Sequence, residues 1–172
     1  MIFSIRKAKA SDAEVLGRIA REAYGKYGSR MTKLPAPVFY EYRDVVAAGH
    51  TWVLLVNDAV YGMFTLVPEF DYLLFRNLAV LPALQGNGLG HKALAFAEFE
   101  AMRLGVAEIR LWTNIHMPEN VPFYRSLGYT ETHRGESGGY SLIYMSKFLP
   151  ARAGNITLNA SKPEENIDVR YT

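Results

Sequence analysis

The chain of 172 residues contains no cysteine. That absence excludes disulfides, thiolate metal sites and a cysteine nucleophile, and it fits a reducing compartment. Long apolar runs are also missing, because no stretch approaches the roughly 18 residues of a membrane-spanning helix. The segment Met1–Lys7 lacks the long apolar core that secretory signals carry. We therefore expect a cytoplasmic protein with no membrane partner.

A strong charge of either sign is missing too. The 19 Lys and Arg residues against 17 Asp and Glu residues leave a formal net charge of +2, and the basic stretch Arg6–Lys9 is short. We expect no nucleic-acid partner, because such binding needs a basic patch or stripe. The remaining composition is that of an ordinary globular protein, with 49% hydrophobic and 21% charged residues. A chain of this length forms one domain with a sizeable core.

The N-terminal part is predicted to contain one strand and two helices. Alternation of apolar and polar residues near residues 3–5 predicts a short strand. Ser11 and Glu14 match a capping box, so a helix is predicted over residues 12–24. A second helix is predicted over residues 35–49, because this segment begins with prolines and ends with a glycine.

The rest of the chain is dominated by strands. The predicted elements are strands over residues 51–56, 60–67 and 72–80, a helix over 92–104, a strand over 108–113, a short helix over 120–127, and a hairpin over 129–134 and 140–146. The full order, β-α-α-β-β-β-α-β-α-β-β, predicts an α/β fold of the α+β type, in which a mixed, mostly antiparallel sheet is flanked by helices. We assign residues 1–148 to this single domain. Residues 149–172 form a polar C-terminal tail that is predicted to add a strand or pack on a partner chain, which would make a homodimer.

A glycine-rich loop lies between a predicted strand and a predicted helix. Residues 85–90 read Gln-Gly-Asn-Gly-Leu-Gly, and glycines let backbone amides turn inward without obstruction by Cβ. A helix that begins here adds free N–H groups and the positive end of its dipole, which suits a diphosphate. A plain tight β-α connection is the alternative. The loop lacks the Lys-Ser/Thr pair of a Walker loop and the Gly-x-Gly-x-x-Gly spacing of a dinucleotide site.

This loop resembles one in a known family. Gln85-x-x-Gly88-x-Gly90 is similar to the Gln/Arg-x-x-Gly-x-Gly/Ala signature of the GNAT superfamily of acyl-CoA-dependent N-acyltransferases. The resemblance is specific over residues 76–129 and extends in topology over residues 1–148. It includes three further segments in the family's order, namely Asn77–Val80, Trp112–Asn114 and Glu119–Tyr129.

The resemblance implies an acetyl-CoA-dependent N-acetyltransferase that moves an acetyl group to a primary amine by direct attack in a ternary complex. The loop amides would hold the CoA pyrophosphate, and residues 78–80 would pair with the pantetheine arm and stabilise the thioester oxyanion. Two asparagines would contact the CoA arm, although turn or cap chemistry is an alternative role for both. The implied cofactor-binding residues are Leu78, Ala79, Val80, Gln85, Gly86, Asn87, Gly88, Leu89, Gly90, His91, Asn114 and Asn120.

Tyr124 is the implied catalytic residue, because it matches the family's tyrosine that faces the CoA sulfur. Its alternative role is that of a core aromatic on an amphipathic helix, together with Phe123 and Leu127. A free phenol has a pKa of about 10 and a thiol about 8.5, so complete proton transfer to a thiolate is uphill by roughly 2 kcal/mol. Hydrogen-bond donation to the developing thiolate is the firmer prediction, and general acid catalysis stays open.

The acceptor amine must lose a proton before it attacks. Glu69 and Asp71 precede the strand that would pair with CoA, and they are the predicted bases, acting through water. Both could equally be surface carboxylates. No metal is expected in this chemistry.

The acceptor is expected to enter opposite CoA, between the first two helices and the last hairpin. No extended acidic run is present to follow a basic peptide, so a small-molecule amine is predicted in preference to a protein amine. A non-catalytic acyl-CoA sensor is the rival interpretation, and turnover with any amine would decide between them. The candidate pocket residues are Tyr24, Tyr27, Arg30, Met31, Phe39, Tyr40, Arg134, Glu136 and Tyr140.

Overall fold

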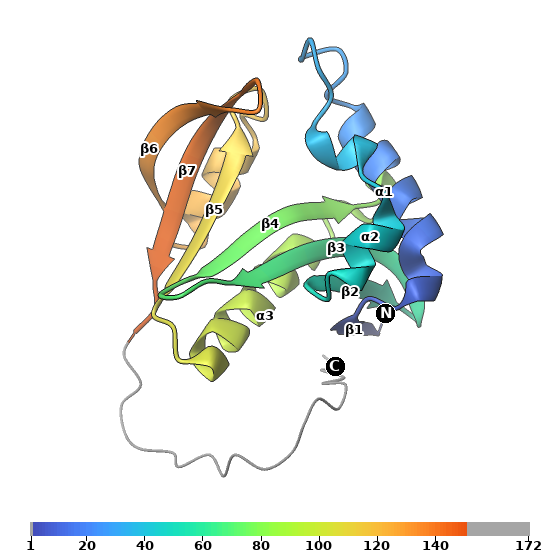
Figure 1. Ribbon diagram of the computed structural model, residues 1–172, viewed down its shortest axis with the longest axis horizontal. Coiled ribbons are helices and arrows are strands. Elements are labelled where there is room, and N and C mark those ends of the chain that lie inside the picture. The colour runs from blue at the N-terminus through green and yellow to red at the C-terminus, as the bar shows by residue number, and fades with distance from the viewer. Residues whose placement is uncertain (1, 151–172) are drawn as a thin grey trace.

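The computed structural model describes residues 2–150, and the order of strands and helices is the predicted one (Figure 1). The strands are β1 (Phe3–Lys7), β2 (Thr51–Val56), β3 (Ala59–Pro68), β4 (Leu73–Val80), β5 (Glu108–Asn114), β6 (Thr130–Ser137) and β7 (Tyr140–Phe148). The helices are α1 (Ala13–Gly25), α2 (Tyr42–Ala47), α3 (Leu89–Leu104) and α4 (Asn120–Ser126). The short 3-10 turns are η1 (Ala10–Asp12), η2 (Ala36–Phe39) and η3 (Pro82–Leu84).

These strands form one seven-stranded sheet in the order β1-β2-β3-β4-β5-β7-β6. Neighbours are antiparallel except β4 and β5, so the predicted mostly antiparallel sheet is confirmed. The parallel contact is short, with Leu73 opposite Ile109 and Leu74 opposite Arg110. Beyond it the two strands diverge (Figure 1). Within the described residues, β4 therefore has no strand partner on this side from residue 75 to residue 80.

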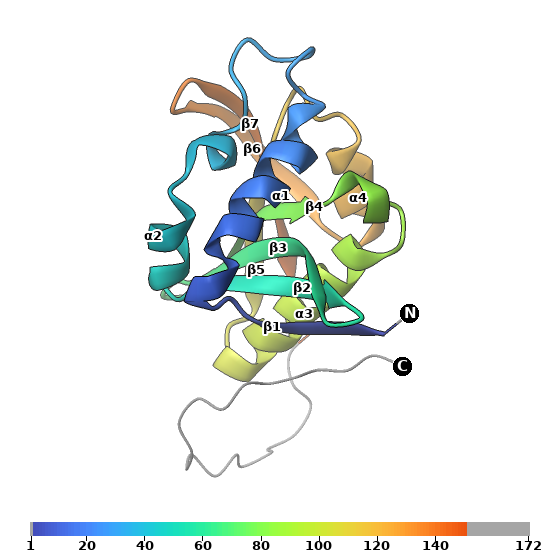
Figure 2. The same cartoon turned by 90° about the vertical axis from the view of Figure 1, so that its right-hand side faces the viewer.

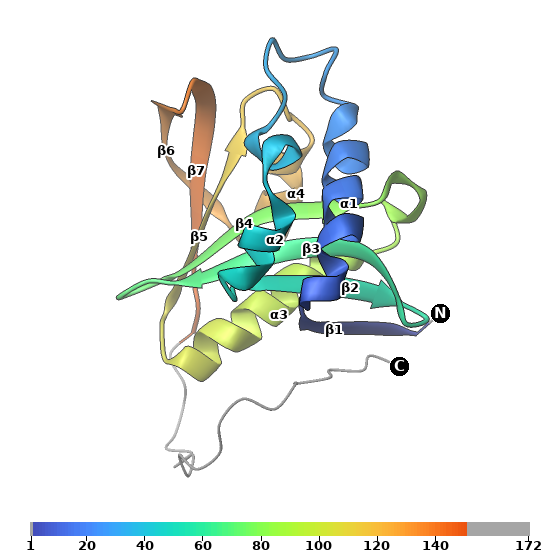
Figure 3. The ribbon, with the colours of Figure 1, turned by 45° about the vertical axis from the view of Figure 1, so that its right-hand side comes forward.

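Helices cover both faces of the part of the sheet formed by β1 to β4 (Figures 2 and 3). α1 and α2 pack on one face and α3 packs on the other. β2 is buried at every position because its side chains alternate between these two layers. Leu54 belongs to the α3 core, whereas Val53 and Leu55 belong to the core under α1 and α2.

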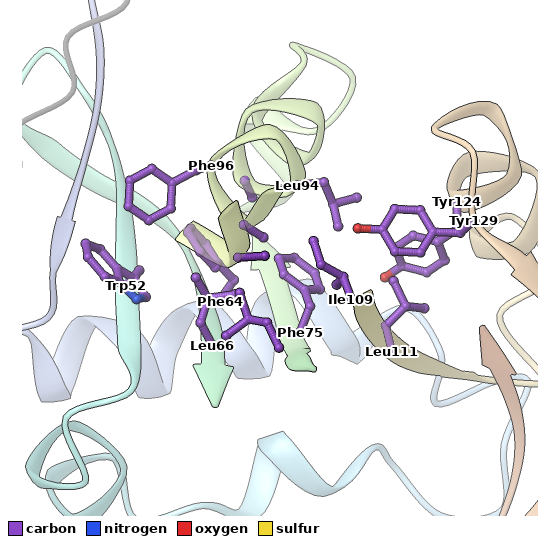
Figure 4. Packing of buried hydrophobic residues seen from close by; sticks show 14 of the residues in the cluster. Trp52, Phe64, Leu66, Phe75, Leu94, Phe96, Ile109, Leu111, Tyr124 and Tyr129 are labelled. Carbon is purple, nitrogen blue, oxygen red and sulfur yellow. The ribbon is translucent and has the colours of Figure 1, made fainter. Parts of the chain in front are cut away.

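The larger core lies between the sheet and α3 (Figure 4). Trp52 and Phe64 pack on Phe96, with ring centroids 4.6 and 6.0 Å from it. The same core continues to α4, where the rings of Tyr124 and Tyr129 lie 6.1 Å apart (Figure 4). This packing fixes α4 beside the gap between β4 and β5.

The predicted cap of the first helix is wrong. Ser11 does not act as N-cap, because the chain forms the η1 turn there and Asp12 precedes α1. The Asp12 carboxylate accepts a 2.7 Å hydrogen bond from the Lys9 amide and pairs with Arg6 at 2.7 Å. A carboxylate that binds both a guanidinium and an amide makes stronger hydrogen bonds than a serine hydroxyl, so Asp12 organises this turn.

The helix predicted over residues 35–49 is interrupted. Tyr40 has an extended backbone, with φ −73° and ψ 144°, and separates η2 from α2. Glu41 then caps α2 by accepting a 3.3 Å hydrogen bond from the Arg43 amide. As a result, residues 35–37 and Tyr40 line a cavity instead of continuing α2.

The described domain closes with β7, which ends at Phe148. The predicted tail lies outside the described residues apart from Leu149 and Pro150, so its added strand and the homodimer stay predictions. None of the described helices is both long and apolar enough to cross a membrane.

Candidate active site

The glycine-rich loop joins η3 to α3 at the end of β4. Gly86 and Gly88 have φ angles of 80° and 79°, a conformation that favours glycine. A Cβ atom at either position would meet no described atom within 4 Å, so the backbone conformation is what requires glycine there. Gly90 differs, because its Cβ atom would lie 3.1 Å from Cζ of Phe123. This glycine lets the first turn of α3 approach α4.

The loop presents a row of free backbone donors. None of the N–H groups of residues 86–91 donates a hydrogen bond within residues 2–150. The first amides of a helix have no intrahelical acceptor, and α3 begins at Leu89 with Gly88 as N-cap. The dipole of this 16-residue helix adds partial positive charge at the same place. The loop therefore has the donors and the potential that an anion such as a diphosphate needs.

Two loop side chains shape the backbone. The Gln85 Nε2 atom donates to the Val80 carbonyl at 2.9 Å, and Lys26 Nζ donates to Gln85 Oε1 at 3.2 Å. Asn87 Nδ2 donates to the Gln85 carbonyl at 3.3 Å. These bonds hold the loop against β4 and α1, and they leave its N–H groups available.

β4 is irregular where it approaches the loop. Asn77 has a φ of 59°, and the pairing with β3 shifts register between Met63 and Thr65. On the α1 side, the Tyr24 hydroxyl donates to the Leu78 carbonyl at 3.0 Å. A bulge bends its strand and interrupts the ladder, so the last part of β4 turns its edge toward the gap beside β5.

The two predicted asparagines have different environments. Asn114 is buried at the end of β5, and its Oδ1 accepts a 2.9 Å hydrogen bond from the His116 amide, which is turn chemistry. Asn120 does not cap α4, because Glu119 is the N-cap residue. The Asn120 Nδ2 atom instead donates to Thr113 Oγ1 at 2.9 Å, which ties α4 to β5.

Tyr124 is a core aromatic and a cavity residue at once. Its ring lies 5.2 Å from that of Phe123, and its side chain is buried. Burial raises the pKa of Tyr124 above its ordinary value. The neighbouring Tyr129 hydroxyl is buried without a hydrogen-bond partner, whereas Tyr124 borders open space on two sides.

Two cavities meet at Tyr124. The loop cavity, of about 390 Å³, lies at the glycine-rich loop, and the hairpin cavity, of about 520 Å³, lies toward the β6–β7 hairpin. Both are lined by Tyr24, Leu78, Met117, Asn120 and Tyr124. The loop cavity is also lined by Ala23, Tyr27, Ala79, Val80, Leu84, Gln85, Gly86, Gly88, Leu89, Gly90, His91, Glu119 and Phe123. The hairpin cavity is also lined by Pro35, Ala36, Pro37, Tyr40, Phe75, Arg76, Asn77, Trp112, Thr113, Asn114, Ser137, Gly138, Tyr140, Leu142 and Tyr144.

The structure brings most of the predicted cofactor residues to the loop cavity. Asn87 is outside it, and Asn114 lines only the hairpin cavity. His91 is exposed at the rim, with its ring edge-on to Phe123 at 5.1 Å. No group of three or more His, Asp or Glu residues that could hold a metal occurs in residues 2–150. The residues that do line the loop cavity are Leu78, Ala79, Val80, Gln85, Gly86, Gly88, Leu89, Gly90, His91 and Asn120.

The predicted bases are not brought to this place. Glu69 and Asp71 are exposed near the β3–β4 turn and line neither cavity. They lie before the start of β4, whereas the loop follows its end, and an eight-residue strand is roughly 25 Å long. Their closeness in sequence to β4 was therefore misleading, because they lie at the end of the strand away from the glycine-rich loop.

The predicted acceptor pocket is found in part. Tyr24, Tyr40 and Tyr140 line the hairpin cavity, whereas Tyr27 lines the loop cavity. Of the other candidates, Arg30 is bound to Glu119 and Arg134 is bound to Glu131. Phe39 is exposed. Sequence reasoning missed Arg76 and Trp112. Strand alternation gave a signal for Arg76, a single charged residue within an otherwise apolar strand pattern.

Contacts between distant segments close the hairpin cavity on one side. The Tyr140 hydroxyl donates to the Leu34 carbonyl at 2.7 Å, and Lys33 Nζ donates to the Gly138 carbonyl at 3.3 Å. Lys33 Nζ also lies 4.7 Å from the centroid of the Tyr140 ring. The segment between α1 and η2 is thereby fastened to the β6–β7 hairpin.

Comparison with known proteins agrees with this architecture. The family model of the acetyltransferase (GNAT) domain matches residues 47–131. The aminoalkylphosphonate N-acetyltransferase of Salmonella typhimurium (strain LT2) is 33% identical over 108 residues, which are 55% of this chain and 70% of that protein. The PaiA N-acetyltransferase of Thermoplasma acidophilum in complex with coenzyme A has a TM-score of 0.70 at 18% identity, over 86% of this chain and 99% of that chain. A Salmonella typhimurium protein solved with its cofactor acetyl-CoA has a TM-score of 0.66 at 22% identity, over 91% of this chain and 99% of that chain.

A sheet that splits between two parallel strands, with free backbone N–H groups at the start of the helix that follows, is the fold that the chain shares with these acetyltransferases. The chain belongs to the GNAT acetyltransferase family. The resemblance that rested on Gln85, Gly88 and Gly90 is confirmed, and so are the fold and the assignment as an acetyltransferase. Acetyl-CoA, the co-substrate which the resemblance implied, is the one bound in a solved neighbour.

Proposed function

We propose that this acetyltransferase moves the acetyl group of acetyl-CoA to the primary amine of a small molecule, by direct attack in a ternary complex. The observation that carries the proposal is the meeting of two cavities at Tyr124. A co-substrate on one side and an amine on the other are held close enough to react without an acylated protein. The absence of cysteine agrees with this direct route.

The loop cavity is suited to the CoA moiety. Residues 86–91 offer free N–H groups to the pyrophosphate, and the space beside Gly86 and Gly88 is open. Lys26, hydrogen-bonded to Gln85 and 3.9 Å from the Glu119 carboxylate, places a partly compensated positive charge at the edge of the loop. The anionic end of the co-substrate therefore meets backbone donors, the helix dipole and a cation in one place.

The unpaired end of β4 is suited to the pantetheine arm. Residues 78–80 line the loop cavity and have no strand partner on that side among the described residues. The hydrogen bond from Tyr24 fixes the Leu78 carbonyl. When bound, acetyl-CoA supplies the acetyl group as a thioester, and an N–H of this segment stabilises the oxygen that becomes negative during attack.

Tyr124 is suited to the departing sulfur. Because burial raises its pKa, the phenol stays protonated and can donate a hydrogen bond as the C–S bond breaks. A phenol is already a weaker acid than a thiol, so stabilisation of the thiolate by a hydrogen bond requires less than full proton transfer. We assign the donor role to Tyr124 on this ground.

The acceptor amine loses its proton to water in this proposal. Among residues 2–150, no carboxylate and no imidazole lines the hairpin cavity. Glu69 and Asp71 have no part in the proposed mechanism, because they line neither cavity. The rate should consequently follow the neutral fraction of the amine and rise with pH.

A small acceptor is favoured over a protein. The hairpin cavity is about 520 Å³ in volume and is closed on one side by the bond between Tyr140 and Leu34. These features suit a compact molecule more than an extended peptide. The Salmonella relative, at 33% identity, is named for small aminoalkylphosphonates, which supports the same choice.

The proposal is tested by measuring CoA release from acetyl-CoA with a panel of small amines and a panel of short peptides. We expect turnover with at least one small amine and none with peptides at equal concentration. Better turnover of peptides would overturn the choice of acceptor. Binding of acetyl-CoA by calorimetry without turnover of any amine would instead favour an acyl-CoA sensor.

A further inference from the structure

We propose that Arg76 binds an anionic group of the acceptor, so that the substrates are small amines that also carry a carboxylate or a phosphonate. This inference rests on the proposed function, because it names the chemistry of the molecule in the hairpin cavity. Among the described residues, the buried Nε atom of Arg76 has no hydrogen-bond partner.

The position of Arg76 directs its side chain into the hairpin cavity. It lies on β4 opposite Thr65, and side chains alternate along a strand. Phe75 packs in the α3 core, so Arg76 turns to the opposite face and lines the cavity. Arg76 and Tyr124 line the same cavity, of about 520 Å³. An amine near Tyr124 and an anion at Arg76 therefore fit within one small molecule.

Arg76 lacks the ion pair that its environment calls for. Its Nε atom is buried without a hydrogen-bond partner, and no carboxylate of residues 2–150 forms a salt bridge with it. Arg6, which is also only partly exposed, is bound by Asp12 at 2.7 Å. A partly buried cation without a partner is unfavourable, so an anionic ligand would stabilise this arrangement.

Arg76 is the only charged residue among those of the described chain that line the cavity, whereas the nearby Lys33 ammonium is bound to the Gly138 carbonyl and the Tyr140 ring. No Asp, Glu, Lys or His residue of the described chain lines the cavity, and its walls include Tyr40, Trp112 and Tyr144. Aromatic walls exclude water and strengthen the attraction between a guanidinium and an anion. The planar guanidinium donates two parallel hydrogen bonds to a carboxylate or a phosphonate.

The same charge selects against other amines. A second ammonium group on the acceptor would lie near Arg76 without a carboxylate to offset the repulsion. Diamines and polyamines are therefore expected to be poor acceptors, although they carry more amino groups. The proposal thus separates amino acids and aminophosphonates from polyamines.

The experiment compares matched acceptors on the full chain with saturating acetyl-CoA. The carboxylate arm is β-alanine against 3-aminopropanol, and the phosphonate arm is 2-aminoethylphosphonate against ethanolamine, with 1,3-diaminopropane as the cationic acceptor. The quantity measured is the ratio of kcat/KM for the anionic to the neutral acceptor of each pair. Comparing the same ratio between protein variants cancels the different reactivities of the amines.

Three variants complete the design. Arg76→Gln removes the charge and Arg76→Lys keeps it without the planar fork. Arg43→Gln removes the charge of an exposed arginine outside both cavities and is the control. We expect Arg76→Gln to lower the ratio about 30-fold, the size of a charge-assisted bidentate contact, with Arg76→Lys between it and wild type. Arg43→Gln should leave the ratio unchanged, and thermal unfolding should show that all variants are folded.

The outcomes separate this inference from the proposed function. Wild type that prefers the neutral acceptor or the diamine, or an Arg76→Gln variant that loses activity equally on both members of a pair, overturns the role of Arg76. If no amine is turned over, calorimetry on the CoA complex with β-alanine and 2-aminoethylphosphonate decides instead. Binding that depends on Arg76 would then keep the inference while the proposed function fails, and absence of binding would overturn the inference as well.

Discussion

The loop cavity and the hairpin cavity share Tyr124, yet they are built in different ways. The loop cavity takes much of its lining from one segment, residues 78–91, whose loop presents free backbone N–H groups, and the rest from α1 and the region of α4. The hairpin cavity is formed by side chains from α1, η2, β4, β5, α4 and the β6–β7 hairpin. Backbone groups depend on only a few residue types, mainly glycine, whereas side-chain contacts depend on each residue. One cavity can therefore hold a fixed ligand while the other determines which acceptor is used.

This difference predicts separable kinetic effects. A change in the loop cavity should alter the KM for acetyl-CoA, and a change in the hairpin cavity should alter the KM for the acceptor. A change at the shared Tyr124 should alter kcat. A change in one cavity that alters both KM values equally would contradict this separation.

The largest effect is expected at Tyr124. Tyr124→Phe keeps the core aromatic and removes the proposed hydrogen bond to sulfur, so kcat should fall about 100-fold, or about 2.7 kcal/mol. Both KM values should stay within about twofold of wild type, because the interaction is made only in the transition state. The measurement is steady-state CoA release with each substrate varied in turn.

The pH dependence sharpens this prediction. Because burial raises the pKa of Tyr124 above the ordinary value of about 10, the phenol stays protonated when a free phenol would begin to ionise. The wild-type rate should rise as the amine loses its proton and show no decline up to about pH 10. A falling limb well below pH 10 that disappears in Tyr124→Phe would contradict the raised pKa, although it would still identify Tyr124 as the donor.

The next effect is expected at the loop. Gly88 has a φ of 79°, where an L-residue costs about 1 kcal/mol. Gly88→Ala should let the backbone relax and misalign the free N–H groups, which raises the KM for acetyl-CoA about tenfold. The KM for the acceptor should not change. Calorimetric titration with CoA gives an independent measure of the affinity.

Gly49 offers a matched control for this change. It has a φ of 77°, and a Cβ atom there would also meet nothing within 4 Å, but it lies outside both cavities. Gly49→Ala and Gly88→Ala should lose similar stability, about 1 kcal/mol each. If both variants weaken CoA binding equally, backbone strain and not the cradle is the cause.

The two cavities also differ in how far the sequence predicts them. The glycine-rich loop is local in sequence, and the φ angles of Gly86 and Gly88 match the residue types found there. Its spacing, together with the segments Asn77–Val80, Trp112–Asn114 and Glu119–Tyr129, identified the family, and the order of the strands followed from apolar patterns. The predicted residues 78–80, 85, 86, 88–91 and Asn120 accordingly line the loop cavity, whereas Ala23, Leu84, Met117, Glu119 and Phe123 line it without having been predicted.

The hairpin cavity depends on contacts that a local pattern does not contain. Arg76 comes to Trp112 and Tyr144 only because β4 and β5 diverge and β7 pairs with β5. The break at Tyr40 also escaped prediction, because the prolines and the glycine that bound this segment give no signal for the extended backbone at its centre. The prediction of Glu69 and Asp71 as bases failed for a related reason, because a strand separates its two ends by its full length.

A smaller effect is expected at the closure of the hairpin cavity. Tyr140→Phe removes the 2.7 Å hydrogen bond to the Leu34 carbonyl, which loosens the segment between α1 and η2. The KM for the acceptor should rise about fivefold and the free energy of unfolding should fall by about 1 kcal/mol. Tyr61→Phe, outside both cavities, is the control. A larger change in the KM for acetyl-CoA than for the acceptor would argue against separate cavities.

The smallest effect is expected at Tyr129, which lies 6.1 Å from Tyr124 but is sealed in the core. Its hydroxyl is buried without a partner, so Tyr129→Phe should raise the free energy of unfolding by about 1 kcal/mol and leave kcat and both KM values unchanged. Denaturant unfolding and CoA release measure the two quantities. A loss of activity comparable to that of Tyr124→Phe would mean that the two tyrosines act together and that the boundary of the site is wrong.

Alkaline unfolding tests the same residue by its charge. Burial, followed by the nearby Glu98 and Tyr124, raises the pKa of Tyr129. A group with a raised folded pKa contributes stability that is fully present below its unfolded pKa of about 10 and is lost as the pH rises above it. The wild-type free energy of unfolding should therefore decline above about pH 10, and Tyr129→Phe, which has one such group fewer, should decline less steeply. Equal slopes would show that the Tyr129 hydroxyl is in contact with solvent, and the contrast with Tyr124 would then rest on kinetics alone.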